Sequence, residues 1–101
     1  MTERPTLDLP ALRRALNMCL DELSRQVGER PVLGHDGYWL IEPADAFDLG
    51  RTPTLAVGSL ADDLDEIATL LAEPEELAIA PWHSLQHLLG PLTYLASATR
   101  P

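Results

Sequence analysis

Residues 54–72, TLAVGSLADDLDEIATLLA, decide the fold because a strand-like run passes directly into a helical pattern within them. Thr54–Val57 is a short β-prone run that ends at Gly58. Ser59 suits a helix cap, since its hydroxyl can accept a hydrogen bond from an amide of the first turn. Apolar residues three and four apart predict a helix over 60–72, which ends before Pro74. The expected apolar positions are Leu60, Leu64, Ile67, Ala68 and Leu71.

A second strand is predicted upstream, at Tyr38–Ile41, where aromatic and branched residues follow the turn dipeptide Asp36-Gly37. The two strands can pair as an antiparallel hairpin with a long connection. A two-stranded hairpin is marginal in water on its own. We therefore expect it to pack on helices or to continue across a second copy of the chain.

Two further helices flank this central region. Residues 9–27 carry apolar side chains at helical spacing, with Asp8 as the cap and Gly28 as the stop. Another helix begins near Trp82, and Gly90-Pro91 predicts a kink or a break within it. The sequence thus predicts a small α+β fold of order α-β-β-α-α, with a flexible leader at 1–8 and one domain over 9–101.

Composition excludes several classes of protein. The chain has 101 residues and a formal net charge of -9, which argues against binding to nucleic-acid phosphates or to anionic membranes. No run approaches the roughly 20 apolar residues of a membrane helix. The N-terminal residues lack the pattern of a signal peptide, and the single Cys19 cannot form an internal disulfide. We expect a cytoplasmic protein.

The acidity is concentrated in the middle of the chain. Residues 36–76 contain eleven acids and only Arg51, whereas residues 1–35 are balanced. We interpret this as a non-enzymatic interaction domain, a homodimer with a basic protein partner, such as an inhibitor or immunity-type protein. The residues expected to bind that partner are Asp45, Asp48, Asp62, Asp63, Asp65 and Glu66. The simpler interpretation of the run at 62–66 is a solvated face that complements the helix dipole.

A metal site is an alternative. His83 and His87 are four residues apart on the last predicted helix, so both rings can reach one side, as in zinc or nickel sites. Position 84 is Ser, so the zincin motif is absent. A third ligand would come from His35 or from the acids of 60–72. Otherwise both histidines simply lie on a polar or interfacial helix face.

Aromatic residues offer a related alternative, a ligand pocket between the hairpin and the last helix. Tyr38, Trp39, Trp82 and Tyr94 would line it together with the two histidines, or would serve the core or an interface. The sequence contains no glycine-rich phosphate loop and no nucleophile elbow. It therefore predicts no cofactor and no catalytic residue.

Overall fold

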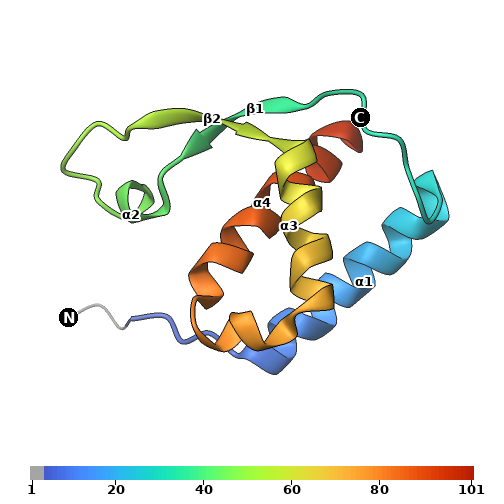
Figure 1. Cartoon of the computed structure of the whole chain (residues 1–101), viewed down its shortest axis with the longest axis horizontal. Coiled ribbons are helices and arrows are strands. Elements are labelled where there is room, and N and C mark those ends of the chain that lie inside the picture. Colours follow the sequence, from blue (N-terminus) through green and yellow to red (C-terminus); the bar gives the residue numbers. More distant parts are fainter. Residues whose placement is uncertain (1–3) are drawn as a thin grey trace. The chain divides into compact units, whose positions relative to one another are not determined.

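The computed structural model describes residues 4–101, so the first three residues of the predicted leader lie outside the description. The elements are α1 (Leu9–Val27), β1 (Gly37–Ile41), α2 (Pro43–Ala46), β2 (Leu55–Ser59), α3 (Leu60–Ala72), the 3-10 helix η1 (Pro74–Ala78) and α4 (Pro81–Ala98) (Figure 1). The predicted α+β fold of order α-β-β-α-α is confirmed, with α2 and η1 as short additions. Across residues 4–101, no helix combines the length and the apolar character that crossing a bilayer requires.

The chain divides into two compact units, Met1–Val32 and Leu33–Pro101, and each is described by itself. The first unit contains α1, whose bounds match the predicted helix at 9–27. Oδ1 of Asp8 accepts a hydrogen bond from the amide of Ala11 at 3.1 Å, which caps the helix. In residues 4–32 no other helix or strand is present, so the apolar stripe of α1 has no partner within its own unit.

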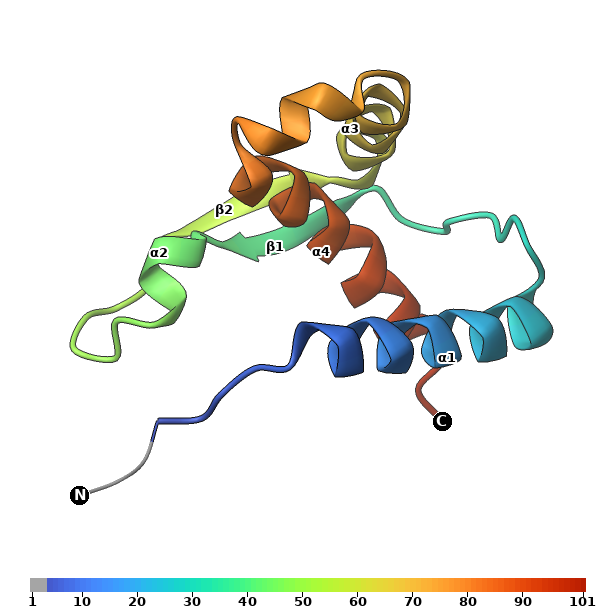
Figure 2. The same ribbon diagram turned by 90° about the horizontal axis from the view of Figure 1, so that it is seen from below.

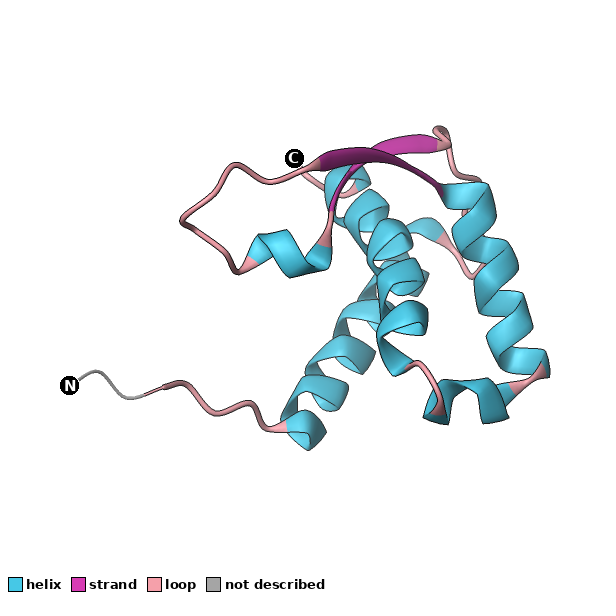
Figure 3. Cartoon of the chain, turned by 60° about the vertical axis from the view of Figure 1, so that its left-hand side comes forward, coloured by secondary structure: helices cyan, strands magenta, loops and turns pink. Residues whose placement is uncertain are grey.

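The second unit is built on the hairpin of β1 and β2. The strands are antiparallel, and Tyr38 pairs with Gly58, Trp39 with Val57 and Ile41 with Leu55. Because side chains alternate along a strand, the last two pairs share one face, and Tyr38 lies on the other. The hairpin runs across one end of the α3–α4 pair, and the connection that contains α2 lies at its far end (Figure 3).

The start of α3 is held by two capping side chains. Oγ of Ser59 accepts from the amide of Asp62 at 3.3 Å, as the sequence predicts. The Asp36 carboxylate accepts from the amide of Ala61 at 2.8 Å and from the Ser59 hydroxyl. Asp36 directly precedes β1, so these contacts fix the beginning of the hairpin to the beginning of α3.

Helix α3 packs against α4, and η1 contacts both helices (Figure 2). Among the described residues, Leu60 is the buried apolar side chain of the core. The predicted apolar stripe is partly wrong, since Leu64, Ala68 and Leu71 are exposed. The buried residues of α3 are Leu60 and Asp63. An acid can be buried there because Tyr38 and His87 contact its two carboxylate oxygens.

Helix α4 continues through Pro91 without interruption, so of the predicted kink or break at Gly90-Pro91 the break is wrong. A proline ring normally disfavours helical geometry in the preceding residue by clashing with its Cβ. That residue is Gly90, which has no Cβ, so this clash is absent. The predicted helix start near Trp82 is one residue from the observed start at Pro81, where proline is well tolerated.

Candidate metal centre

Three potential metal ligands converge between α3 and α4. Glu66 comes from α3, and His83 and His87 come from successive turns of α4. Their ligand atoms all lie within 4.8 Å of one another. The two imidazole rings have centroids 4.8 Å apart and planes at 82°. The structure thus brings the predicted histidine pair together and selects Glu66 from the acids of α3 as the third group.

The spacing of these ligand atoms is wider than the spacing around a bound ion. Zinc bonds to nitrogen and oxygen of about 2.0–2.1 Å in a tetrahedron place ligand atoms about 3.3 Å apart. To close the site around a metal, the ligand atoms of Glu66, His83 and His87 would have to come closer together by up to about 1.5 Å. Imidazole nitrogen with a carboxylate oxygen suits zinc and other late first-row ions better than calcium or magnesium.

The other predicted third ligand, His35, lies elsewhere. Its ring packs against Tyr94, with centroids 6.3 Å apart. The hydroxyl of Tyr94 accepts a hydrogen bond from the Gly34 amide at 2.8 Å, which holds the segment before β1 against α4. His35 is not part of the cluster formed by the other two histidines.

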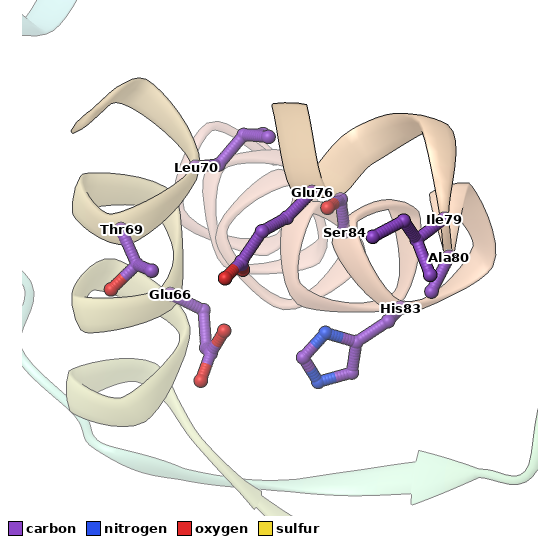
Figure 4. A pocket seen from close by; sticks show the side chains of 8 residues that line it. All are labelled: Glu66, Thr69, Leu70, Glu76, Ile79, Ala80, His83 and Ser84. Carbon is purple, nitrogen blue, oxygen red and sulfur yellow. The ribbon is translucent and has the colours of Figure 1, made fainter. Parts of the chain in front are cut away.

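A cavity of about 290 Å³ adjoins the cluster. Glu66 and His83 both line it and point toward one another from α3 and α4 (Figure 4). The remaining lining residues are Thr69, Leu70, Glu76, Ile79, Ala80 and Ser84. A metal held by three protein ligands keeps a coordination position for water or a small ligand. A metal bound to Glu66 and His83 would border this cavity.

Asp63 is a buried acid beside the cluster, with 3% of its surface exposed. Its Oδ2 accepts a hydrogen bond from the Tyr38 hydroxyl at 2.6 Å, and its Oδ1 lies 2.7 Å from Nδ1 of His87. A buried carboxylate is destabilising unless it is hydrogen-bonded, and both of its oxygens are. Asp63, which the sequence places among the partner-binding acids, thus joins β1, α3 and α4 internally.

Tyr38 is held tightly against Asp63. Burial, followed by the hydrogen bond to Asp63 and its negative charge, raises the pKa of Tyr38 to about 12, so its hydroxyl stays a donor at neutral pH. A Cβ atom at Gly58 would lie 2.4 Å from Cζ of the ring, and one at Gly90 would lie 2.4 Å from the hydroxyl oxygen. The ring therefore fits only because both neighbours are glycine.

The remaining predicted partner-binding acids divide into two groups. Oδ2 of Asp45 accepts from the Thr54 amide at 3.0 Å, and Oδ1 lies 3.4 Å from Arg51. The Thr54 hydrogen bond, together with the Arg51 charge, holds the pKa of Asp45 below its usual value. Asp45 thus organises the β1–β2 connection. Asp48, Asp62 and Asp65 are exposed, although Oδ1 of Asp48 also accepts a hydrogen bond from the Gly50 amide at 3.1 Å.

The aromatic residues do not form one shared pocket. Tyr38 and Tyr94 line a separate cavity of about 200 Å³. Trp39 and Trp82 are exposed and are absent from the residues that line these two cavities. The Trp82 ring instead packs edge-on against His83, with centroids 5.7 Å apart. It thus lies beside the candidate metal centre.

Sequence reasoning missed the role of Asp63, although a signal was present. Asp63 lies three residues after Leu60 and four before Ile67, on the helix face that those apolar residues bury. An acid on such a face requires an internal partner. The identity of that partner could not be predicted from the sequence, because Tyr38 is 25 residues away in the chain.

Comparison of the chain with protein-family models, with curated proteins and with solved structures gave no match. The case for function therefore rests on the geometry of the second unit.

Proposed function

We propose that the chain binds a divalent transition-metal ion through Glu66, His83 and His87, and that zinc is the ion the donor set suits best. The observation that carries this proposal is the convergence of their ligand atoms within 4.8 Å from two helices. Two histidines and one glutamate are a known zinc donor set that leaves a coordination position open. The adjoining cavity gives water or a small ligand access to that position.

The charge of the second unit supports cation binding. Residues 33–101 contain eleven acids and two arginines, Arg51 and Arg100. Arg51 is engaged with Asp45 in the hairpin connection. A strongly acidic surface raises the local concentration of cations and speeds their arrival. A cytoplasmic location is part of this proposal, and the single Cys19, which cannot form an internal disulfide, agrees with it.

The proposal is tested by metal analysis and by melting. We expect zinc to copurify with the protein, and added zinc to raise the melting temperature, because an ion that binds the folded state stabilises it. The His83→Ala/His87→Ala double variant should lose both effects, and His35→Ala should keep them. If the purified wild-type protein contains no metal and its melting is unchanged by zinc, the proposal fails.

A second candidate function is self-association through the hairpin. The face opposite Tyr38 carries Trp39 and Val57, which are 75% and 73% exposed, together with the exposed Ile41 and Leu55. A contiguous apolar patch of this kind commonly marks an interface. The occupant we propose is a second copy of the chain, since one apolar patch can cover its symmetry mate in a closed dimer.

The exposed acids support a further association. Asp48, Asp62 and Asp65 lie on the surface of the most acidic stretch of the chain. A basic protein would meet them with long-range attraction, so its binding would weaken with salt. A pull-down at low salt that recovers no basic partner would count against this association and would leave the metal proposal untouched.

A further inference from the structure

We infer that Tyr38 and Asp63 are positioning residues of the metal centre, which fix the tautomer and orientation of His87 so that its Nε2 faces the ion. This inference rests on the proposed metal binding by Glu66, His83 and His87. It adds that a hairpin residue, through Asp63, helps to set the metal affinity of a site formed between two helices.

The two ring nitrogens of His87 have different roles. A neutral imidazole has one protonated nitrogen and one with a free lone pair, and only the latter binds a metal. An ionised carboxylate can only accept hydrogen bonds, so the contact of 2.7 Å between Asp63 and Nδ1 of His87 favours the tautomer with the proton on Nδ1. Nε2 of His87 is then the nitrogen available to an ion. Carboxylates hold metal-binding histidines in this way in many proteins.

Asp63 is held at both of its carboxylate oxygens. Its carboxylate could rotate if only one oxygen were engaged, but Tyr38 holds Oδ2 at 2.6 Å while Oδ1 contacts His87. Tyr38 in turn packs closely against Gly58 and Gly90, where an added Cβ atom would clash with its ring or hydroxyl. Each group in the series is therefore fixed by the next, from β1 through α3 to α4.

The two histidines differ in burial and in their contacts. His87 is half-buried and its Nδ1 is occupied, whereas His83 is exposed and packs against Trp82. His87 is thus the pre-oriented ligand, to which Glu66 and His83 adjust. Coupling of this kind is reciprocal. Metal binding should strengthen the contact of Tyr38 with Asp63 and slow amide hydrogen exchange in β1.

The test compares zinc affinities of folded proteins by competition with a chromophoric chelator, well below the melting temperature. Asp63→Asn should weaken zinc binding about 10–100-fold, the usual effect of losing such a partner, and Tyr38→Phe should weaken it less. The matched controls are Asp62→Asn, an exposed neighbour, and Tyr94→Phe, which removes a hydroxyl bound to Gly34 instead. Both controls should bind zinc as the wild type does. Unchanged affinity in both folded test variants would overturn the inference.

A second readout does not depend on metal. Nitrogen NMR of the metal-free protein, at a pH where imidazole is neutral, should show His87 protonated on Nδ1 in the wild type and as a mixture of tautomers in Asp63→Asn. Loss of stability alone would not produce that change in a folded variant. Protonation of wild-type His87 on Nε2 would overturn the inference. If the tautomer is as expected but the wild type binds no zinc, the metal proposal fails. The contact between Asp63 and His87 would then have a structural role only.

Discussion

Gly90 of α4 lies so close to Tyr38 of β1 that a Cβ atom at position 90 would be 2.4 Å from the tyrosine hydroxyl oxygen. The same atom would be 2.1 Å from Oδ2 of Asp63. A glycine within a helix usually lowers its stability. Here the missing side chain makes room for the contact between the hairpin and the helices. Packing therefore favours glycine at position 90, whereas helix propensity favours alanine.

Gly90→Ala should therefore destabilise the protein by about 1–3 kcal/mol, the usual range for overpacking. Helix propensity alone predicts the opposite sign, a gain of about 1 kcal/mol. The measurement is the free energy of unfolding in denaturant. Gly34→Ala is the matched control, since its Cβ would meet Tyr94 at an ordinary 3.5 Å and should change little. A stabilised Gly90→Ala would contradict the close packing described above.

Asp36→Ala should lower stability by about 1 kcal/mol or more, the range measured for loss of a helix cap. Its carboxylate accepts from the Ala61 amide and from the Ser59 hydroxyl at the start of α3. Asp65→Ala, which removes an exposed acid of the same helix, should have a smaller effect. Chemical denaturation of the two variants makes the comparison, and equal losses would show that Asp36 does not cap α3.

Stability should fall at high pH through Tyr38. Its pKa is raised from 10.0 to about 12 in the folded protein, so the folded state favours the protonated phenol. This contribution is fully present below pH 10 and is lost as pH rises toward 12. The sequence has no lysine to titrate in the same window. Tyr38→Phe should show a shallower loss of stability between these pH values, and an unchanged slope would contradict the raised pKa.

The hairpin face should control self-association. We expect light scattering to give the mass of a dimer for the wild type at micromolar concentration, and Trp39→Glu to give a monomer. Leu71→Glu changes an apolar residue of similar exposure near the C-terminal end of α3, outside the hairpin, and this variant should remain dimeric. Zinc affinity should be the same in all three proteins. A monomeric wild type would exclude the dimer without affecting the metal proposal.

Local signals account for the parts of the fold that the sequence predicts well. Asp8 and Ser59 cap α1 and α3, and Gly28, with a φ of 85°, follows the last residue of α1. These interactions lie within one turn of the helix ends, so both helices have the predicted bounds. The continuity of α4 through Pro91 was harder to predict, since proline usually disrupts a helix and the mitigating residue is a single glycine.

The site was only half predictable, for a physical reason. The spacing of His83 and His87 is a property of one helix and can be seen in the sequence. Glu66 is one of four acids in a five-residue run, and only the packing of α3 on α4 distinguishes it from its neighbours. Packing likewise buries Asp63 against Tyr38, although the two residues are 25 positions apart in the sequence.

The most direct test of the metal centre is a calorimetric titration of metal-free protein with zinc, for the wild type, Glu66→Gln and Glu73→Gln. Glu73 is an exposed acid at the C-cap of α3, about two turns beyond Glu66. We expect one zinc ion per chain in the wild type, the same affinity in Glu73→Gln, and an affinity at least about tenfold weaker in Glu66→Gln. Equal zinc binding by Glu66→Gln and Glu73→Gln, or none by the wild type, would contradict a site built from Glu66, His83 and His87.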